Sequence, residues 1–113
     1  MNQYRRVSLI LEKLELELRQ LALWQPEAPS AEALASTLPF CVDTLDFHQW
    51  LQFILLVRLR QMLTLQMPLP QQIALYPMAT EVYKQSLQTY APLLECLAEL
   101  DEALTGQPVE RVR

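Results

Sequence analysis

Four residues near the middle of the chain have side chains that could bind a metal or take part in catalysis: Cys41, Asp43, Asp46 and His48. Thiolates, imidazoles and carboxylates are the usual ligands of zinc, and a thiol beside an imidazole can act as a nucleophile. Both aspartates also suit the start of a helix, where a carboxylate accepts hydrogen bonds from free N–H groups. We therefore predict no metal site and no catalytic residue here, and an ordinary hydrogen bond for His48.

Arg58 is the other residue that could do chemistry. It follows Ile54 by one helical turn and Leu51 by two, on a sector crowded with apolar side chains. A charge buried there without a partner costs several kcal/mol, so the guanidinium must reach water or a carboxylate. We favour an ion pair with Glu81 or Asp101. The alternative is that Arg58 binds an anionic group in a groove.

The composition favours an all-α fold. The chain has 113 residues, of which 51% are hydrophobic, and its single glycine is Gly106. A sheet protein of this size needs glycine in many of its turns, whereas the eight prolines suit connections between helices. Loops that bind phosphate also need several glycines, so we expect no cofactor of that kind.

The charge balance argues against direct contact with nucleic acid. Nine Lys/Arg oppose thirteen Asp/Glu, giving a net charge of −4, whereas nucleic-acid binders neutralise phosphates with cationic side chains. The longest uncharged apolar run, residues 53–57, is too short to cross a bilayer. Acidic residues interrupt the N-terminal leucines, and no signal-peptide cleavage site follows them. We therefore expect a cytoplasmic protein with no membrane contact and with reduced cysteines.

The spacing of apolar residues predicts an all-α, four-helix bundle-like fold. The main helices are expected at about residues 2–24, 43–66, 77–88 and 89–104, with a short extra helix near 30–36 that Ser30 caps. Residues 1–106 form one domain, and residues 107–113 form a flexible C-terminal tail. The second main helix is apolar on nearly all sides, which predicts that it is the centre of the bundle.

Three signals agree on where that central helix begins. Asp43 is expected to be the N-cap, and Asp46 then falls at the third helical position, where a negative charge suits the helix dipole. Val42 and Phe47 occupy the two positions of a hydrophobic staple. The predicted first helical residue is therefore Thr44.

Two surfaces could contact a partner. Leu9, Leu16 and Leu23 lie on the side of the first helix opposite its main apolar stripe. We favour the connecting segment 25–42 as their cover, and a partner chain is the alternative. The last helix carries Glu95, Glu99 and Glu102 on one face, which is either solvated or a contact for a basic protein surface.

The segment 39–58 resembles the YqcC-like family of small bacterial proteins. The resemblance is carried by Pro39, Phe40, Asp43, Thr44, Leu45, Phe47, Gln49, Trp50, Leu51, Gln52 and Arg58, with Trp24, Pro26, Leu69, Pro70, Pro77, Met78 and Ala79 in looser agreement. It implies an all-helical bacterial cytosolic protein whose relatives have no established activity. It also implies that the gene often lies beside the gene for tRNA pseudouridine synthase C.

These observations favour a non-enzymatic helical module that binds another protein, with an RNA-modification enzyme or a second copy of the chain as the partner. Binding of a small anionic or apolar ligand between helices is the alternative, and a small helical enzyme is the least favoured function. The expected structural residues are Trp24, Pro39, Phe40, Asp43, Phe47 and Trp50. The candidate contact residues are Leu9, Leu16, Leu23, His48, Gln49, Gln52, Arg58, Glu95, Glu99 and Glu102.

Overall fold

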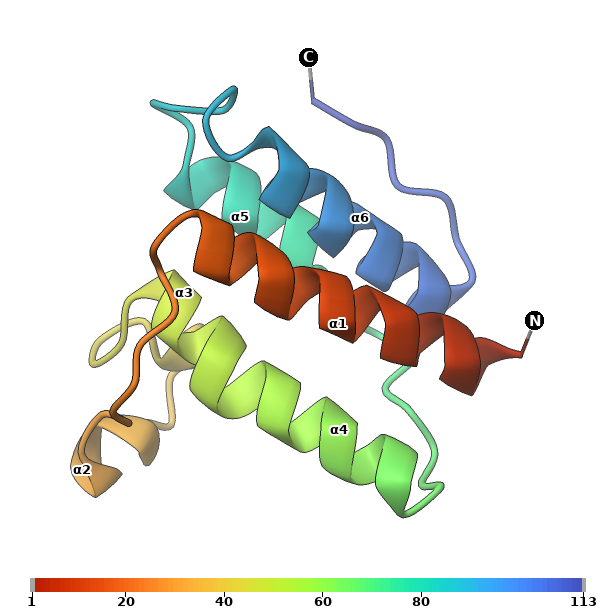
Figure 1. Ribbon diagram of the computed structural model, residues 1–113, viewed down its shortest axis with the longest axis horizontal. Coiled ribbons are helices and arrows are strands. Elements are labelled where there is room, and N and C mark those ends of the chain that lie inside the picture. The colour runs from red at the N-terminus through yellow and green to blue at the C-terminus, as the bar shows by residue number, and fades with distance from the viewer. Residues whose placement is uncertain (1, 113) are drawn as a thin grey trace.

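The computed structural model describes residues 2–112, and every regular element in this range is helical (Figure 1). The elements are α1 (Gln3–Gln20), α2 (Ala31–Leu34), η1 (Pro39–Cys41), α3 (Phe47–Trp50), η2 (Leu51–Leu55), α4 (Leu56–Thr64), α5 (Leu75–Val82) and α6 (Ala91–Thr105). This confirms the all-α prediction. Within the described range, no helix has both the length and the apolar character that crossing a membrane requires.

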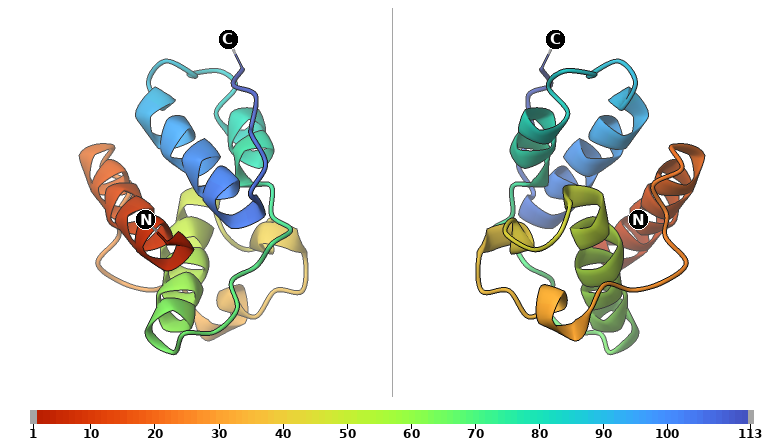
Figure 2. Two further views of the ribbon diagram at one scale, coloured as in Figure 1. Left: turned by 90° about the vertical axis from the view of Figure 1, so that its right-hand side faces the viewer. Right: turned by 90° about the vertical axis from the view of Figure 1, so that its left-hand side faces the viewer.

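Helix α6, rather than the helix of residues 43–66, is the centre of the molecule. It packs between α1 and α5, and α1 also contacts α4 (Figure 2). Its buried residues are Leu93, Leu94, Cys96, Leu97, Ala98, Leu100, Asp101, Ala103 and Leu104. By contrast, Val57 and Leu65 on or beside α4 are exposed. The prediction of a central second helix is wrong because an apolar residue count does not say how many neighbours a helix has.

Helix α1 ends four residues earlier than predicted. Its cap is a Schellman motif, in which the Ala22 N–H donates to the Arg19 carbonyl (3.1 Å) and the Leu23 N–H donates to the Leu18 carbonyl (2.9 Å). The motif requires a left-handed residue, and Ala22 supplies it with φ of 59°. It also turns Leu23 back onto the core.

The second main helix begins three residues later than predicted, at Phe47. Asp46 is its N-cap, and the Asp46 N–H donates to Oε1 of Gln49 (2.8 Å), the reciprocal bond of a capping box. Asp43 instead lies in the preceding turn, where its carboxylate accepts a hydrogen bond from Ser36. Two aspartates three residues apart both suit a cap, and the one followed by Gln49 at the capping-box position is the one used.

The predicted staple between Val42 and Phe47 is absent for the same reason. Val42 is 59% exposed, and the residue before the true N-cap is Leu45, which is buried. The wider helix 43–66 is also not regular, since a π-helical turn, η2, separates α3 from α4. Such turns insert one residue into the helical repeat.

A buried carboxylate in α6 starts α5. Oδ1 of Asp101 accepts from the Leu75 N–H (2.9 Å), and Oδ2 accepts from the Tyr76 N–H (2.8 Å). These two N–H groups have no partner inside their own helix. Helix α5 therefore begins at Leu75, two residues before the predicted start.

Two helix ends carry residues that suit a helix cap. Ser30 caps α2 through Oγ, which accepts from the Ala33 N–H (3.1 Å). Gly106 ends α6 in the left-handed conformation, with φ of 74°.

Glu15 joins α1 to α4, because its carboxylate accepts from Arg60 at 2.9 Å.

Candidate functional site

A partly open, apolar groove lies beside Arg58 and is here called the Arg58 groove. Its volume is about 440 Å³. It runs between η1, the helix formed by α3, η2 and α4, and the irregular segment that precedes α5. The lining residues are Pro39, Phe40, Trp50, Leu55, Arg58, Leu59, Met62, Pro70, Gln72, Ile73 and Ala74. The groove thus gathers several residues of the 39–58 motif with the arginine that follows them.

An aromatic cluster fixes one end of the groove. Phe40 meets Trp50 edge to face, with ring centroids 4.8 Å apart, and Phe47 lies 6.0 Å from Phe40. These contacts hold Phe40 at φ of 58° and Cys41 at φ of 50°. Two consecutive non-glycine residues in the left-handed region carry a conformational cost, which neighbouring packing must offset. The position of Phe40 at this end of the groove is therefore fixed by its packing against Phe47 and Trp50.

Arg58 is exposed and makes no ion pair with any residue of the described range. The predicted pairing with Glu81 or Asp101 is wrong. Glu81 pairs with Lys84 (2.9 Å), and both oxygens of Asp101 accept from the start of α5. The π turn explains the position of Arg58, because it moves the buried face from Leu51 to Leu56 and Leu59.

Gln49 and Gln52, both candidate contact residues, hold the long connection against the helix. Nε2 of Gln52 donates to the Gln25 carbonyl (2.7 Å), and its Oε1 accepts from the Gln25 N–H (2.9 Å). Nε2 of Gln49 donates to Oε1 of Gln25 (3.2 Å). Both side chains are thus used inside the molecule, and the groove keeps Arg58 as its charged group.

The cluster of Cys41, Asp43, Asp46 and His48 does not converge on one point. Cys41 is a buried free thiol, and His48 is half-buried and makes no side-chain hydrogen bond within residues 2–112. The part of the chain that the structure describes contains no group of three His, Cys, Asp or Glu side chains arranged to hold a metal. The other cysteine, Cys96, is also buried, and burial raises the pKa of its thiol to about 12.

The leucine line on α1 is split by the structure. Leu9 is 47% exposed and Leu16 is 52% exposed, whereas Leu23 packs on the core. The segment 25–42 does not cover them, because it leaves the C-terminal end of α1 and loops back beside α3 (Figure 1). The favoured cover was therefore wrong, since Gln49 and Gln52 draw this segment to the other helix.

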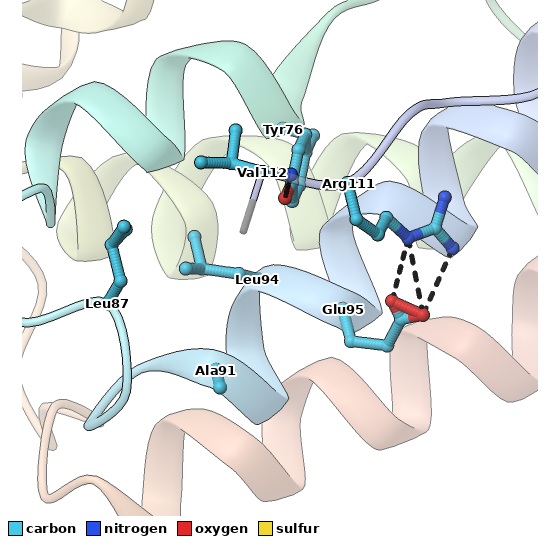
Figure 3. A pocket seen from close by; sticks show the side chains of 7 residues that line it. All are labelled: Tyr76, Leu87, Ala91, Leu94, Glu95, Arg111 and Val112. Carbon is cyan, nitrogen blue, oxygen red and sulfur yellow. Dashed lines mark hydrogen bonds and ion pairs between the residues drawn. The ribbon is translucent and has the colours of Figure 1, made fainter.

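The predicted acidic face is paired with cations of the same chain, and Figure 3 shows one of these pairs, between Arg111 and Glu95. Arg111 donates to Glu95 at 2.8 Å and to Glu102 at 3.0 Å, while Lys13 lies 3.5 Å from Glu99. The hydrogen bonds from Arg111 lower the pKa of both Glu95 and Glu102 below the ordinary value. Arg111 was missed because it lies in the segment that the sequence predicts to be a free tail.

The described part of that tail, residues 107–112, follows α6 back along the molecule. The Val109 N–H donates to Glu102 (2.9 Å), and the Val112 N–H donates to the hydroxyl of Tyr76 (2.7 Å). A second, smaller hollow of about 250 Å³ is bordered by Tyr76, Leu87, Ala91, Leu94, Glu95, Arg111 and Val112 (Figure 3). The sequence predicts a flexible tail here, whereas Val109, Arg111 and Val112 are held by hydrogen bonds to α5 and α6. Arg113 lies outside the described range.

Comparison with known proteins places these features in a family. The model of the DUF446 family, described as tRNA pseudouridine synthase C, matches residues 6–103. A Haemophilus influenzae protein named as uncharacterized is 38% identical over 92 residues, covering 80% of this chain and 87% of that protein. The Escherichia coli protein YqcC is 35% identical over 103 residues, covering 90% and 91%. The solution NMR structure of Escherichia coli YqcC aligns with a TM-score of 0.83 and 30% identity, covering 100% of this chain and 97% of the other.

A longer relative is also similar. A Pectobacterium carotovorum protein named tRNA pseudouridine synthase C is 36% identical over 70 residues. The match covers 62% of this chain but 19% of that protein. Most of the Pectobacterium protein thus lies outside the region that resembles this chain.

Proposed function

Since this chain belongs to the YqcC family, as its 39–58 motif predicts, we propose that it is a non-enzymatic helical module that binds tRNA pseudouridine synthase C. One observation carries the proposal. In the Pectobacterium protein of that name, a segment similar to this chain occupies 19% of a longer polypeptide. A segment joined covalently to another acts at high effective concentration beside it. A separate chain of the same family would reach that position by binding.

The use of the buried polar residues supports a scaffolding role. Gln52 and Asp101 are buried in the described range, and each polar atom of their side chains is hydrogen-bonded to a backbone group. Buried polar groups that act in catalysis usually face a cavity and a substrate instead. Gln52 and Asp101 thus serve to position the connection and α5, whereas the buried hydroxyl of Tyr83 has no hydrogen-bond partner within the described residues.

The charge of the chain supports a protein rather than tRNA as the direct contact. The net charge is −4, so tRNA phosphates would be repelled at long range, whereas an enzyme that binds tRNA presents cationic surface. The proposal requires that the chain and the synthase share the cytoplasm.

The test is direct binding between this chain and the tRNA pseudouridine synthase C of the same organism, both purified and mixed in titration calorimetry. We expect a saturable complex of defined stoichiometry that also elutes as one peak in size-exclusion chromatography. A matched control is a pseudouridine synthase of another specificity from the same organism, which we expect not to bind. No heat and no co-elution at low and moderate salt would overturn the proposal.

A second candidate function, binding of a small amphipathic anion, has one observation in its favour. The volume of the Arg58 groove, about 440 Å³, falls in the usual range of small-ligand sites. Thermal shift with apolar carboxylates tests this candidate, and no stabilisation by any of them would remove it.

A further inference from the structure

The Arg58 groove has a charge, a length and a set of backbone groups that together define its occupant. We infer that it holds an extended segment of the partner, with apolar side chains on either side of one carboxylate. The inference rests on the proposed function, because the partner is the synthase, and it names the surface by which the two proteins meet.

The charge of the groove calls for an anion. Arg58 is the one ionisable residue among the lining residues, and no carboxylate of the described range pairs with it. Its surroundings are apolar, with Leu55, Leu59 and Met62 on the same helix. A guanidinium at an apolar surface loses water when a partner docks, and it then forms strong paired hydrogen bonds with a carboxylate. An apolar segment without an acidic residue would leave this charge unpaired.

The length of the groove calls for a peptide rather than a compact molecule. One wall follows the helix from Trp50 to Met62, a distance of about 18 Å at the rise of an α-helix. An extended chain of about five residues spans that distance. A small-molecule site normally encloses most of its ligand, whereas this groove is partly open to solvent.

The opposite wall offers backbone hydrogen bonds. Gln72 and Ile73 line the groove, and neither their N–H nor their carbonyl groups bond to any other residue within the described range. An extended peptide can pair with such free backbone groups, as in strand addition. The aromatic end at Phe40 and Trp50 then receives an apolar side chain of the same peptide.

The experiment compares the binding of three forms of the chain to the synthase in calorimetry: wild type, Arg58→Glu and Arg5→Glu. Arg5 is the control because it is also exposed, is outside the groove and makes no ion pair within the described residues. We expect Arg58→Glu to weaken binding by about tenfold or more, and Arg5→Glu to leave it unchanged. Unfolding temperatures of the three forms verify that both variants fold.

The outcomes separate this inference from the proposed function. If the wild type does not bind, the proposed function fails and the inference fails with it. If the wild type and Arg58→Glu bind equally, the inference is overturned while the proposed function stands.

A photo-crosslinking amino acid at Gln72 gives an independent readout. We expect it to capture a segment of the synthase in which an Asp or Glu lies among apolar residues. Capture of a segment without a carboxylate would overturn the inference. Octanoate is the small-molecule probe: if it binds through Arg58 and the synthase does not displace it, the groove is a ligand site and the inference is wrong.

Discussion

The side-chain amide of Gln52 pairs with both backbone groups of Gln25, its Nε2 donating to the carbonyl at 2.7 Å and its Oε1 accepting from the N–H at 2.9 Å. Gln52, a buried residue of the π turn, thereby makes to Gln25 the two backbone hydrogen bonds that a neighbouring strand would make. This contact decides on which side of the molecule the connection runs. It also leaves Leu9 and Leu16 uncovered.

Gln52→Ala should therefore destabilise the fold. The change removes both partners of the Gln25 backbone, and leaving such groups unpaired costs about 1–3 kcal/mol. Urea unfolding measures the loss. Gln61→Ala is the matched control, because Gln61 is exposed on α4, and its effect should stay within about 0.5 kcal/mol. Equal stability of the two variants would mean that Gln52 does not hold the connection.

Asp101→Asn should change how stability depends on pH. Burial raises the pKa of Asp101, although hydrogen bonds from the Tyr76 and Leu75 N–H groups act in the lowering direction. The folded protein thus keeps this proton to a higher pH than the unfolded chain does. The resulting stabilisation is complete below the unfolded pKa, about 3.9, and is lost as pH rises through the folded pKa.

The measurement is urea unfolding of wild type and Asp101→Asn over a series of pH values. As pH rises from the unfolded to the folded pKa of Asp101, the wild type should lose stability. Asp101→Asn has no carboxyl group at this position and should not show this loss. At neutral pH the variant should be less stable by about 1–3 kcal/mol. The side-chain amide has one oxygen that can accept a hydrogen bond, so one of the Leu75 and Tyr76 N–H groups loses its partner. A difference between the two proteins that does not vary with pH would contradict the assignment.

Arg111→Ala should release the tail and raise the pKa of Glu95 and Glu102 toward the ordinary value. Because the pKa values of Glu95 and Glu102 are lowered, their pairs with Arg111 stabilise the fold at any pH above the unfolded carboxyl pKa. This stabilisation is lost as the pH falls through the folded pKa values. The pairs are partly exposed, so the cost should stay below about 1 kcal/mol.

Carbon-detected NMR titration of the glutamates checks the pKa change, with Arg5→Ala as the control. Amide exchange at Val109 and Val112 reports on the tail itself, which the contacts predict to be slow in the wild type. Fast exchange of both amides in the wild type would restore the expectation of a flexible tail.

Ala22→Gly and Gln66→Gly should each stabilise the protein. Both residues end helices in the left-handed region, with φ of 59° and 55°, where a side chain costs about 1–2 kcal/mol. Glycine removes this cost but adds freedom to the unfolded chain, so we expect a gain of about 0.5–1 kcal/mol at each site. Ala35→Gly is the control, because φ there is −91° and no gain is expected. Thermal unfolding of the three variants decides the question.

Leu9→Gln and Leu16→Gln should leave stability within about 0.5 kcal/mol of the wild type, whereas Leu14→Ala in the core should cost about 2–5 kcal/mol. Sedimentation of the same variants tests the alternative of a homodimer through α1. If the wild type sediments as a dimer and Leu9→Gln as a monomer, this face is covered by a second copy. A large loss of stability in a monomeric Leu9→Gln would contradict the observed exposure.

Signals confined to a few neighbouring residues were predictable. The single glycine and eight prolines indicated an all-helical chain, and Ser30 caps α2 as predicted. The apolar residues keep helical spacing over the whole of α6, so this helix could be predicted from the sequence. These features depend on composition, on local spacing or on a capping residue. None of them requires knowing which other helices lie nearby.

Signals that depend on distant contacts were not predictable. The capping box between Asp46 and Gln49 is a local signal that the sequence does contain, whereas the bond from Ser36 that engages Asp43 in the preceding turn is not visible in the sequence. Likewise, Asp101 and Arg111 act on residues far along the chain, at Tyr76 and Glu95. A pattern within one helix cannot reveal either partner.

The π turn has a further consequence for reading sequences of this kind. Upstream of Leu51 and downstream of Leu55 the helix follows two separate phases, offset by one residue, or about 100° around the axis. A helical wheel drawn through the whole segment therefore assigns Arg58 to the interior, although the guanidinium looks out over the groove. A shift of one residue within 51–55 would exchange lining and core positions in the rest of this helix, so the π turn fixes the register of α4.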